Sequence, residues 1–468
     1  MKNISKIISV IFLILSIILF IYVFYRSEIF HLGTNLNFYL KYYIFSLLLI
    51  ILSVISFFIE RDLKIKITIV VTSTIISLYL VEGSLTFYKY LNSKNYRIKK
   101  VSIEYDTRDR YVIYQDLKKE NSNIVVTMSP LIFIDEINQD IFPLSGISNR
   151  KTIFCNENGY YSIYQSDRYG FNNPNGEWDK KEIEYLLVGD SFTHGACVNE
   201  PDDISGNLKS MIDKKMGVLN LGYTGNSPIT EYASLKEYFP TANVKRVLWI
   251  YYENDILVLK KELNNQILLN YLNNNKFTQN LKLRQKELDK KLIHRLLTKE
   301  EEKMKQNMVT YNNLYRERLS LRSFIKMSSI RLQIYKIVNS YFKQDPSLPF
   351  AEFKQTINLA KNFSESNGAK FYFIFFSDYR NYYNNLLINS EKHSRSRNHK
   401  MIIEIINNLN ISIIDIHTEV LKNHKDPLSF YSKFPLLPFK PYGHYNELGY
   451  KVITNHIFNK IKEYESIN

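Results

Sequence analysis

The stretch Tyr185-Leu186-Leu187-Val188-Gly189-Asp190-Ser191-Phe192-Thr193-His194-Gly195 decides the fold of this chain. Its short apolar run predicts a buried parallel strand. The run ends in Gly-Asp-Ser, where the backbone must turn sharply. This turn places the Ser191 hydroxyl at the carboxyl end of a central strand, where open α/β sheets bind ligands. The residues after Asp203 have a helical pattern, so free backbone N–H groups that can hold an anion lie near the serine.

Strand and helix patterns alternate outward from this stretch. Alternation of this kind predicts βαβ units and a parallel sheet. The expected strands are 183–189, 217–221, 245–252, 370–376 and 411–416, and the expected helices lie near 203–215, 228–238, 350–366, 394–408 and 446–464. The predicted core is therefore an α/β domain of about five parallel strands.

Three further motifs accompany the serine. Val218-Leu219-Asn220-Leu221-Gly222 is followed by Tyr223-Thr224-Gly225-Asn226-Ser227-Pro228, Val247 to Tyr252 ends in Glu253-Asn254-Asp255, and Tyr442-Gly443-His444-Tyr445-Asn446 opens the last helix. A serine, a glycine, an asparagine and a late histidine in this order resemble the SGNH (GDSL-like) hydrolase superfamily. The resemblance covers roughly residues 182–461. It implies a flavodoxin-like three-layer α/β/α fold and serine hydrolase or acyltransferase chemistry.

The chemistry that these residues suit can be stated in its own terms. A serine hydroxyl needs an adjacent base to act as a nucleophile at neutral pH, and histidine is the natural one. We expect Ser191 to be the nucleophile and His444, at a loop-to-helix junction, to be the base. A tetrahedral oxyanion needs donors fixed in advance. The Ser191 N–H, the N–H of Gly222 or Gly225, and the Asn254 amide are the candidates, with Gly225 preferred because Gly222 belongs to the strand exit.

The group that orients the imidazole is open at this point. Members of the superfamily usually carry an aspartate two or three residues before the histidine, but this chain has Tyr442 and Pro441 there. Asp426 could fold back onto His444, or a backbone carbonyl could orient the ring and leave a Ser-His dyad. His194, three residues after Ser191, is a further residue expected in the cleft. Asp190 and Asp255 are expected to accept loop N–H bonds.

Residues 1–90 predict a membrane anchor of about three transmembrane helices. Ile7–Tyr25, Tyr42–Ile59 and Ile67–Val81 each approach the roughly 20 residues needed to cross a bilayer. The first run is too long for a signal peptide and lacks a cleavage site. The third is interrupted by Thr and Ser, so an interfacial or packed helix is its alternative. Lysines before the first run and basic residues between the second and third place the N-terminus in the cytoplasm and the large domain on the periplasmic or extracellular side.

Residues 91–180 are expected to be a β-rich connecting segment. Tyr111–Tyr114 and Asn123–Met128 have the pattern of short strands. Arg168 lies in a turn-rich stretch and is expected either to line the cleft or to form a structural ion pair. The two cysteines, Cys155 and Cys197, are expected either to form a disulfide over the rim of the site or to be buried free thiols.

Residues 257–345 interrupt the alternation inside the predicted hydrolase domain, 181–468. The charged stretch 285–306 has helical spacing with alternating signs. We therefore expect a helical insertion. A lid, an oligomer contact and a membrane-facing surface are its open roles, and a solvated helical hairpin is the commonest outcome for such a charge run.

The net charge of +15 over 468 residues invites a nucleic-acid interpretation, but the basic residues are dispersed and no nucleic-acid motif accompanies them. A basic surface beside a membrane better suits anionic lipids or acidic glycans. No metal-ligand spacing or cofactor loop is present. The motifs and the apolar runs together predict a membrane-anchored serine esterase or O-acyltransferase. The resemblance to the superfamily implies acyl esters of cell-envelope glycans as its substrates, and with them envelope polysaccharide machinery as its partner. The alternatives are a lipid-directed esterase and a non-catalytic glycan-binding or assembly protein.

Overall fold

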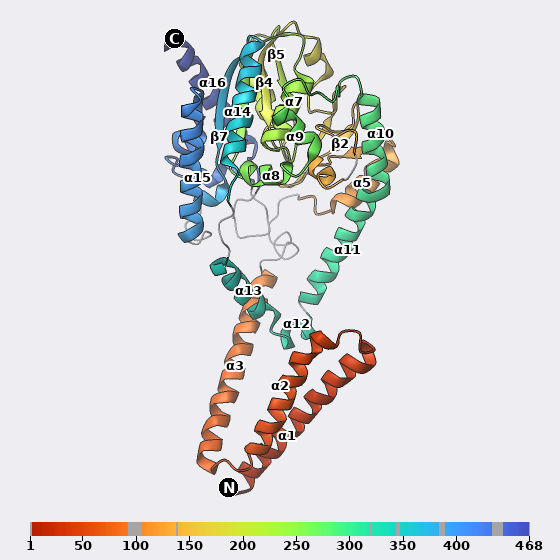
Figure 1. Ribbon diagram of the computed structural model, residues 1–468, viewed down its shortest axis with the longest axis vertical. Coiled ribbons are helices and arrows are strands. Elements are labelled where there is room, and N and C mark those ends of the chain that lie inside the picture. The colour runs from red at the N-terminus through yellow and green to blue at the C-terminus, as the bar shows by residue number, and fades with distance from the viewer. Residues whose placement is uncertain are drawn as a thin grey trace. The chain divides into compact units, whose positions relative to one another are not determined.

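The computed structural model describes residues 2–91, 105–136, 139–318, 320–342, 347–382, 389–432 and 443–467. The chain divides into two compact units (Figure 1). The first comprises Met1–Tyr88 with Glu317–Val338, and the second comprises Lys89–Arg316 with Asn339–Asn468. Part of the insertion thus belongs to the unit that holds the N-terminal helices.

Three long helices open the first unit: α1 (Lys2–Phe24), α2 (Leu36–Ile55) and α3 (Arg61–Leu91). A π-helical turn, Tyr25–Phe30, follows α1. All three helices are long and apolar enough to cross a membrane. Serine hydroxyls join the first two, since Ser9 donates to the Ser56 carbonyl at 3.2 Å and Ser16 to the Leu49 carbonyl at 3.4 Å. Such contacts satisfy polar groups internally, as an apolar environment requires.

Five parallel strands form the sheet of the second unit. They are β4 (Glu182–Gly189), β5 (Gly217–Asn220), β6 (Asn243–Tyr252), β7 (Lys370–Phe376) and β8 (Ser412–Asp415), in the order β5-β4-β6-β7-β8. This is the flavodoxin-like order, so the predicted fold class is confirmed. Gly189 pairs with Ile250, and Leu187 with Asn220, so the carboxyl ends of β5, β4 and β6 meet at one edge.

Helices cover both faces of this sheet (Figure 1). Alternate strand residues point to opposite faces. Leu186, Val188 and Trp249 join the core under α7 (Pro228–Tyr238), α9 (Gln266–Asn273), α14 (Phe350–Ser366) and α15 (Asn389–Asn408). Leu187 and Ile250 join the core under α6 (Ile204–Lys209) and α16 (Glu447–Ile467). The result is the expected three-layer α/β/α arrangement.

The segment before the sheet contains more helix than expected. It holds α5 (Arg110–Glu120), β1 (Val125–Val126), a 3-10 turn (Pro130–Phe133), β2 (Lys151–Ile153), β3 (Ile163–Gln165) and a second 3-10 turn (Asn175–Asp179). The strands form a small sheet in the order β1-β2-β3. The strand predicted at Tyr111–Tyr114 is wrong, because these residues lie in α5. The Asp109 carboxylate accepts the Tyr111 N–H at 2.9 Å and starts the helix.

The insertion between β6 and β7 is helical, as expected. Its helices are α8 (Asp255–Glu262), α9, α10 (Gln285–Arg295), a π turn (Leu296–Glu300), α11 (Glu301–Arg318), α12 (Leu321–Ile325) and α13 (Ser328–Phe342). Leu268, Leu288 and Leu292 join the core of the second unit. The first half of the insertion is therefore an integral part of the α/β domain and no separate hairpin.

Candidate active site

Ser191 stands in a tight turn directly after β4. The Asp190 carboxylate accepts the Phe192 N–H at 2.9 Å, and the His194 N–H donates to the Asp190 carbonyl at 3.0 Å. A side chain at Gly189 would meet the Thr193 hydroxyl at 2.1 Å, so only glycine allows this close turn. Burial raises the pKa of Asp190 to about 6. The N–H bond that its carboxylate accepts from Phe192 is the structural contact expected of Asp190.

His444 meets the Ser191 hydroxyl directly. Its Nε2 lies 2.8 Å from Ser191 Oγ, although 253 residues separate the two in sequence. The same hydroxyl lies 3.3 Å from the Asp190 carboxylate, which is a longer contact. The structure thus brings together two of the predicted site residues, at a distance suited to proton transfer.

The carboxylate behind His444 belongs to Glu157. His444 Nδ1 lies 3.1 and 3.2 Å from the two Glu157 oxygens, and the His444 backbone N–H donates to Glu157 Oε2 at 2.7 Å. An ionised carboxylate can only accept, so Nδ1 carries the proton and Nε2 is left to accept from Ser191. Ser191, His444 and Glu157 form a hydrogen-bonded triad.

Opposite charges set the pKa values of the last two members. Burial by itself would lower the pKa of His444, but the charge and hydrogen bond of Glu157 outweigh it and raise that pKa above its ordinary value. Burial likewise opposes ionisation of Glu157, yet attraction to His444 holds the pKa of Glu157 below its ordinary value. The pair therefore favours an ionised carboxylate facing an imidazole that readily takes a proton.

Asp426 is corrected as the orienting residue. Its side chain is exposed, and its backbone N–H donates to His424 Nδ1 at 3.1 Å, while Glu157 occupies the position beside His444. The positions before His444 that usually hold the aspartate, Pro441 and Tyr442, lie outside the described residues. Gly443 adopts φ +73°, and a side chain there would collide with the Glu157 carboxylate at 2.2 Å. The histidine loop is thus shaped to receive Glu157.

Glu157 comes from the hairpin between β2 and β3. The two cysteines form a disulfide, which joins this hairpin at Cys155 to the loop that follows Ser191 at Cys197. Asn158 Nδ2 donates to the Cys197 carbonyl at 2.9 Å. On the other side, the Tyr160 hydroxyl donates to Glu447 in the first turn of α16. The hairpin is therefore fixed to both loops that carry the other two triad members.

The turn after β5 packs against the nucleophile loop, since the Tyr223 N–H donates to the Gly189 carbonyl at 3.1 Å. The Gly222 N–H donates to Asn220 Oδ1 at 2.8 Å, so this donor is already used. Gly225 has φ +82°, and a side chain there would meet the Ser129 hydroxyl at 2.0 Å. Within the described ranges, the Gly225 N–H has no acceptor. Gly225 is accordingly the better oxyanion candidate of the two.

His194 supports this turn and is enclosed by the protein. It is fully buried, and its Nδ1 accepts the Thr224 N–H at 3.2 Å. Its ring stacks on Tyr223, with the ring centres 4.7 Å apart, and lies tilted against Phe154 at 4.3 Å. Burial lowers the pKa of His194 to about 3, so the ring stays neutral. The expectation of a cleft residue is corrected, because aromatic packing encloses the ring.

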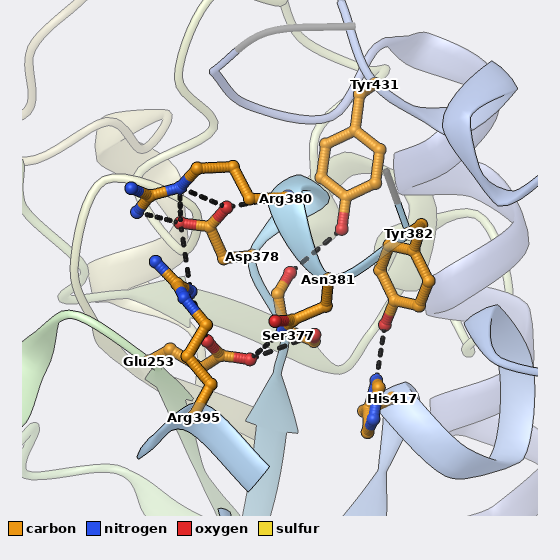
Figure 2. Close-up of polar contacts among 9 residues, drawn as sticks. All are labelled: Glu253, Ser377, Asp378, Arg380, Asn381, Tyr382, Arg395, His417 and Tyr431. Atoms are coloured by element: carbon orange, nitrogen blue, oxygen red, sulfur yellow. Dashed lines mark hydrogen bonds and ion pairs between the residues drawn. The ribbon is translucent and has the colours of Figure 1, made fainter. Parts of the chain in front are cut away.

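Asn254 begins α8 at the end of β6, and its side chain is exposed. Because the strand order is β5-β4-β6, the Gly225 turn lies on one side of Ser191 and Asn254 on the other. The residue before it, Glu253, is held in a polar network (Figure 2). Glu253 accepts from Ser377 at 3.0 Å and from Arg395 at 2.7 Å. This network fixes the turn on which Asn254 stands.

The same network extends along the carboxyl edge of the sheet (Figure 2). Asp378 pairs with Arg380 at 2.6 Å, and the Tyr382 hydroxyl lies 2.6 Å from His417 Nδ1. The Tyr431 hydroxyl donates to the Ser377 carbonyl at 2.8 Å. The polar groups of these residues are hydrogen-bonded to one another, and the network stabilises the carboxyl ends of the strands.

Two functional residues of the site were absent from the sequence-based candidates. Phe192 packs against the His444 ring at 4.7 Å and against Tyr252 at 4.3 Å, which fixes the imidazole from behind. Glu157 is the other. The position of Phe192 next to Ser191 was a usable signal, whereas nothing in the sequence around Glu157 distinguishes it from other loop glutamates.

Arg168 forms a structural ion pair, which is one of the two roles expected of it. Its guanidinium binds Asp179 through two contacts of 2.8 and 2.9 Å, and its backbone N–H donates to Asn175 at 2.7 Å.

Glu157, Cys197 and His444 place potential metal-ligand atoms within 4.8 Å of one another. Cys197 Sγ is bonded to Cys155 and His444 Nδ1 faces the carboxylate as a donor, so this trio does not suit a metal ion.

No known family model and no curated protein matches the chain. Solved structures similar to it include a protein described as lipolytic and of the G-D-S-L family from Desulfitobacterium hafniense, with 13% identity and a TM-score of 0.30, over 59% of this chain and 98% of that one. A lipase/acylhydrolase from Enterococcus faecalis has 13% identity and a TM-score of 0.31, over 60% and 96%. The acetylxylan esterase Axe2 from Geobacillus stearothermophilus has 12% identity and a TM-score of 0.29, over 60% of this chain and 96% of that one. Similarities this low carry no argument about activity, which rests on the geometry above.

Proposed function

We propose that this chain is a membrane-anchored serine esterase or O-acyltransferase that forms an acyl-enzyme on Ser191. The observation that carries the proposal is the hydrogen-bonded series from Ser191 Oγ through His444 to Glu157, at the carboxyl end of β4. Nucleophile, base and orienting carboxylate are the three parts that acyl transfer by serine needs.

The first half-reaction uses each group once. His444 Nε2 takes the Ser191 proton while Oγ attacks the carbonyl carbon of the ester. The N–H groups of Ser191 and Gly225 and the amide of Asn254 are the donors proposed for the resulting oxyanion. The intermediate collapses, the bond to the leaving alcohol breaks, and that alcohol takes the proton from His444. The acyl group remains on Ser191, and Glu157 stabilises the imidazolium during the transfer.

The second half-reaction decides between the two activities. Water or a sugar hydroxyl gives its proton to His444 Nε2 and attacks the carbonyl carbon of the acyl-serine. The bond between that carbon and Ser191 Oγ then breaks, and His444 returns the proton to Oγ, which restores the free serine. Water makes the chain an esterase, and a sugar hydroxyl makes it an O-acyltransferase. Both routes use the same residues, so the acceptor distinguishes them.

Acyl esters of cell-envelope glycans are the proposed substrate class, with the domain on the periplasmic or extracellular side beside polysaccharide machinery. Two observations support this placement. Three helices are apolar enough to cross a membrane. The Cys155–Cys197 disulfide suits an oxidising compartment outside the cytoplasm. The argument for a non-catalytic protein was that no carboxylate precedes His444 in the usual position. Because Glu157 supplies a carboxylate beside His444, that argument no longer applies.

Covalent labelling tests the proposal. The full chain in detergent is incubated with a fluorescent fluorophosphonate, next to Ser191→Ala and the control Ser210→Ala, an exposed serine on α6's C-terminal side. We expect wild type and Ser210→Ala to be labelled and Ser191→Ala to be blank. Labelling of Ser191→Ala at the wild-type level would refute the assignment. Acetylated polysaccharide and phospholipid are then compared as substrates. Turnover of phospholipid alone would contradict the glycan substrate and favour a lipid-directed esterase.

A further inference from the structure

Helices α12 and α13 of the insertion attach to the transmembrane helix α3. Glu82 of α3 is buried, and its two carboxylate oxygens accept the Ser329 and Ile330 N–H groups at 2.9 and 2.8 Å. A carboxylate at the start of a helix neutralises its free N–H groups and its dipole. The Tyr79 hydroxyl of α3 donates to the Ile325 carbonyl at 3.1 Å. These contacts lie within one compact unit and fix both helices against α3.

The attachment lies near one end of the apolar span. The span of α3 runs from Arg61 to Tyr88. A helix rises about 1.5 Å per residue, so Glu82 is about 30 Å from Arg61, which is about the thickness of the hydrocarbon core. With Arg61 at one surface, Glu82 and the helices bound to it lie at the opposite boundary between acyl chains and headgroups.

Both helices expose large apolar side chains. Leu321 and Ile325 of α12 are 74% and 57% exposed, one helical turn apart. Ile334, Tyr335 and Val338 of α13 are also exposed. Glu82 holds the start of α13, and these apolar side chains remain exposed. An amphipathic helix with such side chains is stable at a bilayer surface.

Charge agrees with the same placement. The sequence from 320 to 338 contains four Arg or Lys and no Asp or Glu. Arg322, Lys326 and Arg331 are exposed. Basic side chains beside an apolar helix face attract anionic headgroups, each by about 1 kcal/mol near the surface.

We infer that α12 and α13 form an interfacial membrane element, embedded by their apolar side and held to anionic phospholipid headgroups by their basic residues. Bilayer lipid is the assigned occupant because the apolar side continues from a helix that itself exposes Ile69, Ile76 and Leu80 along its length. Of the open roles of the insertion, the inference assigns the membrane-facing surface to this part. It holds independently of the reaction proposed for Ser191.

Depth-dependent quenching tests this inference on the full chain in proteoliposomes. Because both native cysteines are in a disulfide, a single added cysteine can carry an NBD probe. We place it at Leu321 or Ile334, at Ile76 as a deep reference, and at exposed Lys303 of α11 as an aqueous reference. The first two should be quenched several-fold more by a shallow doxyl lipid than by a deep one, and little by iodide.

Two results would overturn the inference. Probes at Leu321 and Ile334 that iodide quenches as strongly as at Lys303 would place the helices in water. Shielding from both iodide and doxyl lipid, lost when the protein is diluted into excess lipid, would assign the surface to a second copy.

Adding phosphatidylglycerol to phosphatidylcholine vesicles should increase doxyl quenching at Leu321, and Arg322→Gln with Lys326→Gln and Arg331→Gln should abolish the increase. No response to the anionic lipid would refute the headgroup assignment.

Discussion

Replacing Glu157 by glutamine tests the triad at its least expected member. The substitution keeps the size of the side chain and removes the charge opposite His444 Nδ1. In the structure the carboxylate accepts from both Nδ1 and the His444 backbone N–H, at 3.1 and 2.7 Å. A glutamine has one acceptor oxygen, so the backbone N–H and Nδ1 must compete for it. If its amide faces Nδ1, the imidazole proton moves to Nε2, and the base can no longer accept from Ser191.

The size of the effect follows from these contacts. A hydrogen bond to a charged group contributes about 1.5 to 3 kcal/mol. Losing the charge and one of the two contacts raises the barrier by about 3 to 4 kcal/mol, because the interaction is strongest when His444 is protonated in the transition state. Each 1.36 kcal/mol is tenfold in rate, so kcat should fall about a hundredfold to a thousandfold. Fluorophosphonate labelling of Ser191 should slow in parallel.

The pH profile gives a second readout. His444 must be neutral to act as a base, and Glu157 raises its pKa. Activity of the wild type therefore falls as the pH drops through that raised pKa. In Glu157→Gln the pKa of His444 decreases, so the acid limb of kcat/KM should move to lower pH even though the plateau is lower. The assay is hydrolysis of p-nitrophenyl acetate by the full chain in detergent, measured between about pH 5 and 9, which brackets the ordinary histidine pKa.

Asp426→Asn is the matched control, since it removes a carboxylate that is exposed and away from His444. It should keep both the wild-type rate and the wild-type acid limb. A Glu157→Gln enzyme at the wild-type rate, together with an Asp426→Asn enzyme that has lost a hundredfold, would show that the reasoning about Glu157 is mistaken.

Three further outcomes follow from the same site. Gly443→Ala should reduce kcat as much as Glu157→Gln does, because its φ of +73° is strained for alanine and the added carbon meets the Glu157 carboxylate; thermal unfolding measured beside the rate separates this from general destabilisation. Reducing the disulfide, or replacing Cys155 and Cys197 by serine, should lower kcat more than it changes KM, since the Glu157 hairpin is released. Protease added to spheroplasts should cleave the domain from about residue 105 onward, as detected by an antibody to the C-terminal part.

Each of these outcomes has a control. Gly176→Ala adds the same carbon where nothing lies within 4 Å, so its rate should stay at that of the wild type. The doubly substituted cysteine variant should be insensitive to reductant, and a further loss of rate in reductant would place the effect elsewhere. Protection of the domain until the inner membrane is broken would contradict the proposed topology.

The parts of the molecule that were predictable are those whose signal is local. The apolar run Tyr185–Val188 predicts a strand buried on both faces, and β4 is such a strand. The boundaries of α7 and β7 agree with the sequence because a proline or a charged residue marks their starts. Ser191 and His444 could be chosen because each stands next to an element boundary. Where the local signal was ambiguous, as at Tyr111–Tyr114, the cap at Asp109 favoured a helix.

Glu157 could not be predicted because its role arises only in three dimensions. It lies 287 residues from His444, outside the α/β core, in a hairpin rich in Asn, Gly and Tyr. The usual search for an orienting acid covers the residues just before the histidine, and that search leads to Asp426 as the nearest upstream aspartate. Only the packing of the small sheet on the nucleophile loop shows that the acid comes from the opposite end of the domain.

An acid that comes from a separate hairpin has to be held in place by more than its own hydrogen bonds. Ordering each backbone residue costs about 1 to 2 kcal/mol. The disulfide joins positions separated by 42 residues, and closing a loop of that length stabilises the folded state by about 4 kcal/mol in the chain-entropy description. This stabilisation offsets the entropy cost of ordering a few residues on either side of Cys155. Glu157, two residues after Cys155, is among them. The position of the crosslink, two residues from the carboxylate and six from the nucleophile, therefore stabilises the geometry that acyl transfer requires.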